Sequence, residues 1–310
     1  MSSLMKRIAC LVAVGLALIG ATAAWTWSRL NAGRGRGGPA VPRELFAKPW
    51  TDRPVTLLGI GDSITAGYGA RAGWSYFDRL ARSPDGEFAE MRGISLAAVI
   101  PDLRARNIAA NGSTSLEHWE HRVKDLAVER ERLGIVCLTT GGNDIIHNYG
   151  RWAPREGAMY GATMEQARPW IANFESRLGR MLDRIAESFP AGCHIFLANI
   201  YDPTDGAGEI PGLPAWKDGL PVLAAYNEVI ARCAAARPGV HLVDIHALFR
   251  GHGIKAWDRW YYGNVEDPNE RGYDALRRAF LLEMARAFEQ RANSAVPVEY
   301  STGWMSTGAS

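Results

Sequence analysis

The chain has 310 residues, of which 47% are hydrophobic and 22% are charged, a size and composition typical of one globular α/β domain. Its formal net charge of +2 at pH 7 comes from 35 basic and 33 acidic side chains, so no excess of positive charge marks a nucleic-acid-binding protein. We therefore expect a small molecule or a surface polymer as the partner, and no nucleic acid.

The first 24 residues have the order of an export signal. Two basic residues, Lys6 and Arg7, precede an apolar run over residues 8–20, and small residues follow it up to Ala23. This is the order of a secretory signal peptide, but the apolar character continues to about the 18 residues of a short membrane-spanning helix. We expect a signal peptide or an N-terminal membrane anchor, and a protein that is periplasmic, extracellular or anchored facing outward.

Two further segments flank the predicted folded domain. Residues 25–54 are rich in Arg, Gly and Pro, which predicts a flexible linker. Residues 292–310 are rich in Ser, Thr and Gly and lack periodicity, which predicts a disordered tail. The domain itself should therefore occupy residues 55–291.

Within this domain, short apolar runs alternate with long amphipathic ones, which predicts a parallel sheet flanked by helices. The expected strands are residues 55–60, 106–110, 135–140, 194–200 and 240–243. The expected helices are residues 115–132, 164–188, 221–236 and 269–290.

Polar and glycine-rich turns follow the first three expected strands. The first is GDSITAG at residues 61–67, the second contains Asn111 and Gly112, and the third is GGND at residues 141–144. Ligands of an open parallel sheet collect at the carboxyl ends of its strands. Each turn alone is ordinary turn chemistry, and a lone serine there is a helix N-cap, but three in succession indicate a functional site.

In these three blocks the chain resembles the SGNH hydrolases, the GDSL-type esterase and lipase superfamily, over roughly residues 55–290. The resemblance implies a flavodoxin-like three-layer α/β/α domain, with Ser63 as the nucleophile of an ester hydrolase. It also implies an oxyanion hole made by the backbone N–H groups of Ser63 and Gly112 and by the side chain of Asn143. It implies no cofactor and no metal.

The segment that should supply the catalytic base departs from this family. The superfamily carries a DxxH segment ahead of Pro, Asn and a Gly-Tyr pair, whereas residues 264–273 read NVEDPNERGY. Asp267 therefore occupies the histidine position and Asn264 the aspartate position. A serine hydroxyl needs an adjacent base, normally a histidine oriented by a carboxylate.

Three interpretations follow from this departure. In the first, Asp267 orients a histidine from another loop, with His252 as the leading candidate and His147 and His118 as rivals. In the second, Asp267 acts directly on Ser63, although its reference pKa of about 3.9 makes it a weak base unless burial raises that value. In the third, catalysis is lost and the pocket only binds a ligand.

We expect a serine hydrolase that cleaves a carboxylic ester, such as an O-acyl group on a carbohydrate or a lipid, through an acyl-serine intermediate. The predicted catalytic residues are Ser63, His252 and Asp267. The alternative is a non-catalytic binding protein of the same fold. A flavodoxin-type cofactor binder is disfavoured because no glycine-rich phosphate loop follows the first strand.

Overall fold

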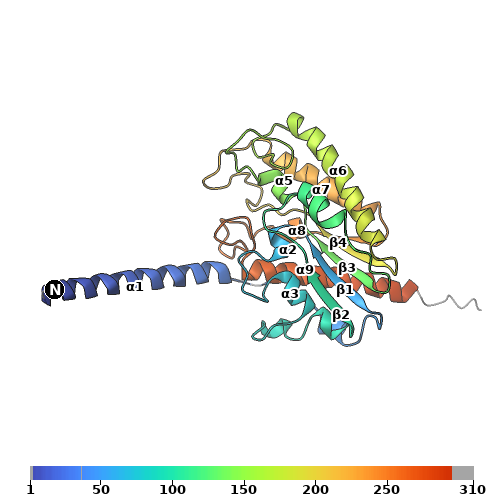
Figure 1. Cartoon of the computed structure of the whole chain (residues 1–310), viewed down its shortest axis with the longest axis horizontal. Coiled ribbons are helices and arrows are strands. Elements are labelled where there is room, and N and C mark those ends of the chain that lie inside the picture. Colours follow the sequence, from blue (N-terminus) through green and yellow to red (C-terminus); the bar gives the residue numbers. More distant parts are fainter. Residues whose placement is uncertain (1–2, 36, 295–310) are drawn as a thin grey trace, which may run out of the picture.

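Five parallel strands form the centre of the computed structural model, which describes residues 3–35 and 37–294 (Figure 1). The strands are β1 (Val55–Ile60), β2 (Leu103–Asn107), β3 (Leu133–Leu138), β4 (Cys193–Ala198) and β5 (Val240–Val243). Their order across the sheet is β2-β1-β3-β4-β5, and every neighbouring pair is parallel. The predicted parallel sheet of about five strands is confirmed.

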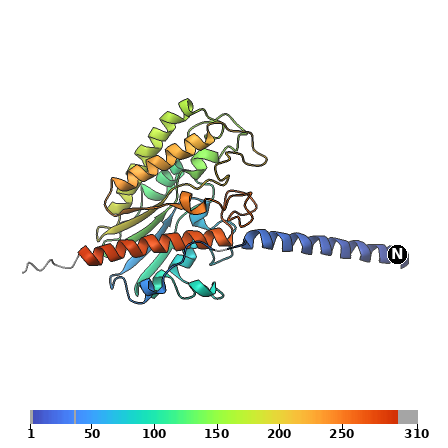
Figure 2. The same cartoon turned by 180° about the vertical axis from the view of Figure 1, so that it is seen from behind.

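Helices cover both faces of the sheet because alternate residues of a strand point to opposite faces. Val55 and Leu57 of β1 belong to one buried cluster, together with residues of α3 (Tyr76–Ala81) and α9 (Glu270–Ser294). Leu58 and Ile60 belong to a second cluster, with residues of α6 and α7. The helix α6 is Met164–Glu187 and α7 is Gly219–Ala235. Figure 2 shows the two layers on either side of the sheet, and the predicted α/β/α sandwich is confirmed.

The other helices lie at the ends of strands or outside the sandwich. They are α1 (Ser3–Ala32), α2 (Ser63–Ala66), α4 (Ser115–His118), α5 (Gly142–Ile146) and α8 (Ile245–Phe249). Short 3₁₀ turns occur at Arg43–Phe46, Ala89–Met91 and Leu96–Ala98, and one π-helical turn at Trp119–Val123. The helix α2 lies within the first polar turn, α4 follows the second, and α5 begins within the third.

Several expected elements differ from the structure in their bounds. The strand expected at 106–110 runs three residues earlier, since Leu103 already pairs with Val55. The helix expected at 115–132 ends after Val123, because the guanidinium of Arg184 takes the carbonyls of Lys124 and Leu126 that a continuing helix would use.

The expected linker over residues 25–54 also differs from a free tether. The helix α1 continues to Ala32 and projects from the body (Figure 1). Farther on, Val41 is buried and the indole of Trp50 stacks on Phe288 at 5.5 Å between ring centroids. Apolar side chains with a partner on α9 bury surface that a solvated linker would leave in water.

For the two ends of the chain, the export or anchor segment and the disordered tail stay predictions. The side chains of Leu11, Leu16 and Ile19 on α1 are exposed by 73%, 65% and 68%. Among helices within residues 3–35 and 37–294, none is both long and apolar enough to cross a membrane. The expected tail lies outside the described residues from position 295 on, and α9 covers its first three positions.

Candidate active site

Ser63 is the first residue of α2 and stands directly after β1. The carboxyl group of Asp62 caps this helix, accepting hydrogen bonds from Ile64 N at 3.1 Å and from Thr139 Oγ1 at 2.8 Å. Gly61 has φ +151°, and a Cβ there would lie 2.2 Å from Thr139 Oγ1. The turn therefore needs glycine, and this close approach fixes the serine at the carboxyl edge of the sheet.

The turns that follow β1, β2 and β3 each carry a hydrogen-bond donor suited to an oxyanion site. The backbone N–H groups of Ser63 and Gly112 have no partner in the described part of the chain. Gly112 has φ +73° with open space where a Cβ would stand. Asn143 lines the same cavity as Ser63, and one of its amide hydrogens is held by the carbonyl of Ser113 at 3.0 Å. This arrangement supplies donors of the kind that stabilise an oxyanion.

A buried carboxylate ties the second and third turns together. Asp144, fully buried, accepts hydrogen bonds from Ser115 N at 2.8 Å and from the Ser115 hydroxyl. The guanidinium of Arg177 lies 3.7 Å from it and donates to Ser115 Oγ at 3.0 Å. Asp144, the aspartate of the GGND block, therefore holds the turn that carries its chain neighbour Asn143.

His118 is a structural residue in this geometry. Its ring is fully buried, with Nε2 2.7 Å from Ser113 Oγ and Nδ1 2.8 Å from Thr140 Oγ1. Burial lowers the pKa of His118 to about 4, so the ring is neutral at physiological pH. It links the second and third turns and has no contact with Ser63.

The structure does not bring the other two histidine candidates to Ser63. His252 stacks on Trp260 with ring centroids 3.6 Å apart, and its Nδ1 lies 3.2 Å from the Asp258 carboxylate. His147 is exposed at the end of α5. Neither ring borders the cavity that contains Ser63. His252 is held by Asp258 and Trp260 and is therefore not placed to act as the base.

Asp267 lines the same cavity as Ser63. Its buried carboxyl group accepts a hydrogen bond from Asn264 Nδ2 at 2.6 Å, and the neighbouring Ser63 hydroxyl lowers the pKa of Asp267. The Oδ1 of Asn264 is occupied by the backbone N–H groups of Glu266 and Asp267, at 3.3 and 3.1 Å. The amide of Asn264 can therefore present only its NH₂ group to Asp267.

Asn264 and Asp267 form a hydrogen-bonded pair of reversed polarity. In a histidine–aspartate pair the imidazole N–H donates and the carboxylate accepts. Here the residue next to serine is the acceptor, and its partner is the donor. Asn264 and Asp267 therefore complement each other as donor and acceptor. With only one of the two replacements, two hydrogen-bond donors or two acceptors would face each other.

Three carboxyl groups with raised pKa values lie in this region. Burial raises the pKa of Asp62 to about 6, and burial together with the nearby Asp267 raises the pKa of Glu266 to about 7. Burial also raises the pKa of Asp267, while the hydrogen bonds from Ser63 and Asn264 act in the opposite direction. A buried carboxylate with a raised pKa is a stronger base than a free one.

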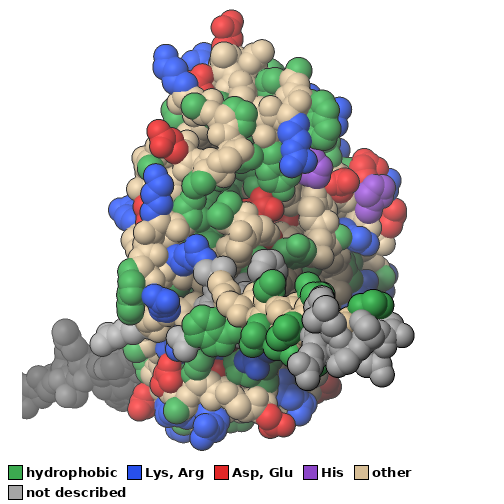
Figure 3. Space-filling model, turned by 90° about the vertical axis from the view of Figure 1, so that its left-hand side faces the viewer, with side chains coloured by type: hydrophobic (Ala, Val, Ile, Leu, Met, Phe, Trp, Pro, Cys, Tyr) green, Lys and Arg blue, Asp and Glu red, His purple; other side chains and the backbone are tan. Residues whose placement is uncertain are grey.

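An apolar cavity opens beside Ser63. Its volume is about 140 Å³, close to that of an apolar protein cavity that holds benzene. The space-filling view of this end of the molecule shows acidic side chains near the centre of the face, among hydrophobic ones (Figure 3). The apolar residues that line the cavity include Ile145, Ile146, Ile200, Leu213, Trp216 and Leu223.

The sequence pattern had not singled out Glu266 or Tyr149. Glu266 lines the cavity, and its Oε1 accepts a hydrogen bond from the Tyr149 hydroxyl at 3.1 Å. The only indication of Glu266 in the sequence was its position next to Asp267, in the segment over residues 264–273 that departs from the family. Nothing in the sequence links Tyr149 to a residue 117 positions away.

Comparisons with known proteins agree with this geometry. Residues 60–275 match the model of the GDSL-like Lipase/Acylhydrolase family. An extracellular lipase from Streptomyces rimosus is 19% identical with a TM-score of 0.53, over 74% of this chain and 99% of that one. The acetylxylan esterase Axe2 from Geobacillus stearothermophilus is 18% identical with a TM-score of 0.51, over 75% and 95%. These two likenesses show a shared fold. No curated protein matches the chain.

Proposed function

Because the chain belongs to the GDSL-like lipase/acylhydrolase family, we propose that it hydrolyses a carboxylic ester through an acyl-Ser63 intermediate. One observation carries the proposal: the Ser63 hydroxyl and the buried Asp267 carboxyl group line the same apolar cavity, where the serine acts on the pKa of Asp267. A hydroxyl with an adjacent proton acceptor is the minimum that nucleophilic catalysis by serine requires.

In the proposed reaction, Asp267 takes the proton of Ser63 as its oxygen attacks the ester carbonyl. The negative charge that develops on the carbonyl oxygen is stabilised by the N–H groups of Ser63 and Gly112 and by the Asn143 amide. Loss of one such donor typically costs about 10²–10³-fold in rate. Expulsion of the alcohol leaves the acyl group on Ser63, and water then releases it.

The cavity supports an apolar acyl group as the part of the ester that is bound. Its lining includes five Ile, three Leu and one Trp, and a site of this size accepts a short alkyl or a ring-sized group. We propose an O-acyl group on a carbohydrate or a lipid, with the acyl part in this cavity.

A second candidate is a binding protein without catalysis. It is favoured by the absence of any histidine beside Ser63 among the described residues, since an unperturbed aspartate with a pKa near 3.9 is a weak base at neutral pH. Against it stands the burial that raises the pKa of Asp267.

The test uses the full chain, a fluorophosphonate probe and a series of short p-nitrophenyl esters. We expect covalent labelling of Ser63 and turnover of the esters, and neither in Ser63→Ala. If the wild-type protein is not labelled and releases no p-nitrophenol, the hydrolase proposal is wrong and the binding protein remains.

We also propose that residues 1–24 direct export or membrane attachment. The support is the order of basic, apolar and small residues and the exposure of the described apolar side chains on α1. Fusing residues 1–54 to a reporter that is active only outside the cytoplasm would show activity if the proposal holds. A reporter that remains inactive would contradict it.

A further inference from the structure

Asp62, Glu266 and Asp267 are three of the four carboxyl groups that line the cavity beside Ser63, and Asp202 is the fourth. In the described part of the chain, no lysine, arginine or histidine forms an ion pair with any of the three. Nor do the described residues include a group of three or more metal-binding side chains placed to hold an ion. Like charges this close disfavour full ionisation, so the cluster retains protons.

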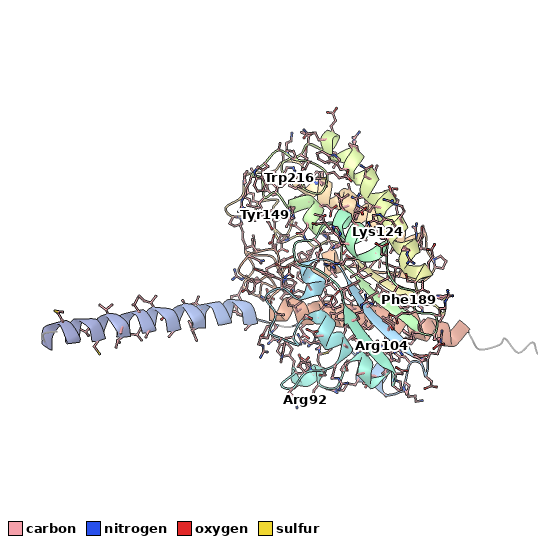
Figure 4. All side chains as sticks on the ribbon, in the orientation of Figure 1. Arg92, Arg104, Lys124, Tyr149, Phe189 and Trp216 are labelled. Atoms are coloured by element: carbon pink, nitrogen blue, oxygen red, sulfur yellow. The ribbon has the colours of Figure 1, made fainter. Side chains whose placement is uncertain are left out.

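Glu266 is held in a defined position within this cluster. Its Oε1 accepts a hydrogen bond from the Tyr149 hydroxyl at 3.1 Å, and its backbone carbonyl accepts one from the Tyr201 hydroxyl. Its Oε2 has no hydrogen-bond partner among the described residues. Figure 4 shows Tyr149 in the loops at the same end of the molecule as Trp216, whose side chain lines the cavity. One carboxyl oxygen of Glu266 is thus fixed, and the other is free for a substrate.

The backbone at both ends of this contact is strained. Val265 has φ +67° and Tyr149 has φ +50°, and only one other described non-glycine residue has a positive φ. A β-branched residue disfavours this conformation strongly. Such outliers persist where the surrounding structure enforces them, and they cluster at functional sites. The two loops thus adopt unfavourable conformations where they bring Tyr149 and Glu266 together.

We propose that Glu266 is a second catalytic carboxyl group, which donates a proton to the departing alcohol while Asp267 holds the proton of Ser63. This inference rests on the proposed ester hydrolysis. Pairs of carboxyl groups whose surroundings give them different protonation states divide acid and base roles in this manner.

The proton balance closes over one turnover. In acylation the Ser63 oxygen bonds to the acyl carbon and its proton passes to Asp267; the carbon–oxygen bond to the alcohol breaks, and the alcohol oxygen takes the proton of Glu266. In deacylation water attacks the acyl carbon and gives one proton to Glu266, which is then restored. The Ser63 oxygen leaves with the proton held by Asp267. The net reaction is ester and water to acid and alcohol.

The groups around Glu266 bring its pKa into the neutral range. Asp267 from its own loop raises its pKa, and burial acts in the same direction, against the hydrogen bond from Tyr149; the value is about 7. The guanidinium of Arg151 lies 5.6 Å from the centroid of the Tyr149 ring, and the charge of Asp267 raises the pKa of Asp62. Asp267 receives two hydrogen bonds that stabilise its charge. Glu266 can therefore hold a proton in the neutral pH range, while the ionised form of Asp267 is the one that its hydrogen bonds stabilise.

The test compares leaving groups in Glu266→Gln. An alkyl alcohol needs a proton to depart, whereas p-nitrophenolate and fluoride leave as stable anions. For Glu266→Gln we expect kcat/KM to fall by about 10²-fold or more with an alkyl ester, and by less than about threefold with the matched p-nitrophenyl ester. Fluorophosphonate labelling of Ser63 should continue at the wild-type rate. Glu266→Asp should recover part of the alkyl-ester activity, and Glu209→Gln, on an exposed loop, should match the wild type.

The outcomes separate this inference from the function on which it rests. Equal losses with both esters, or no loss with either, would overturn the role of Glu266 while leaving Ser63 as the nucleophile. A fall in alkyl-ester kcat/KM above about pH 7 in the wild type, absent in Glu266→Gln, would support it. A wild-type protein with neither labelling nor turnover would end both proposals.

Discussion

Replacing Asp267 by histidine should produce a poor enzyme, although histidine is the usual base in this family. The NH₂ group of Asn264 lies 2.6 Å from Asp267 Oδ2, and its Oδ1 is held by two backbone N–H groups. A neutral imidazole at position 267 would therefore accept from Asn264. Its only N–H would then point to Ser63, where a lone pair is needed.

The expected magnitude follows from this tautomer. An asparagine in place of the orienting aspartate lowers kcat by about 10⁴-fold in a serine protease triad, which corresponds to about 5.5 kcal/mol. Adding Asn264→Asp supplies an acceptor and reverses the tautomer. We expect Asp267→His alone to be the weaker enzyme, and the double variant to exceed it by about 10³–10⁴-fold.

The assay is kcat/KM for a p-nitrophenyl ester, with the rate of fluorophosphonate labelling as a second readout. Asn264→Asp alone serves as the matched single variant. There two carboxyl groups would face each other at the present 2.6 Å, with a repulsion of about 6 kcal/mol at an effective dielectric constant near 20. If Asp267→His alone equals the double variant, Asn264 does not set the tautomer and the reversed-polarity pair has no functional meaning.

Three further predictions concern other residues. Burial raises the pKa of Asp62 from 3.8 to about 6. The free energy of unfolding of the wild type should therefore fall by about 3 kcal/mol relative to that of Asp62→Asn as the pH rises from about 4 to 7. Urea unfolding at both pH values that shows no such divergence would contradict this. Leu223 lines the cavity, and Leu223→Trp would fill part of it and should shift the substrate preference toward acetyl esters. The measurement is kcat/KM for p-nitrophenyl acetate, butyrate and hexanoate. An unchanged profile would place the acyl group elsewhere. Asp274 accepts hydrogen bonds from three buried arginines. Asp274→Ala should lower the free energy of unfolding by about 3–5 kcal/mol, because it leaves buried charges without a partner. A change below about 1 kcal/mol in denaturant unfolding would refute the importance of these hydrogen bonds.

The fold could be predicted from the sequence because its signal is local. The strands β1 and β5 begin and end at the expected residues, since a buried parallel strand is a short apolar run between turns. The helix expected to reach residue 132 was wrong because its end depends on Arg184, a residue 60 positions from Lys124. Local periodicity carries no information about such a distant hydrogen bond.

The histidine candidates show the same limit at the site. His118, His147 and His252 each follow a loop at the carboxyl edge, which made all three candidates. Their roles differ because of their neighbours: His118 is enclosed by two hydroxyl groups, and His252 by an aspartate and a tryptophan. A chain position near the active edge does not fix the direction in which a side chain points.

The sequence by itself determined the succession of strands and helices along the chain, the glycines of the turns and the place of Ser63 among them. Backbone conformation and apolar burial depend on residue type and spacing, which the sequence contains. Tertiary structure alone decided which groups lie beside the serine. It placed Asp267 at the same cavity as Ser63, turned Asn264 to donate to Asp267, and set Glu266 against Tyr149. Protonation and hydrogen-bond polarity depend on burial and on partners from distant segments, and only the folded chain supplies these.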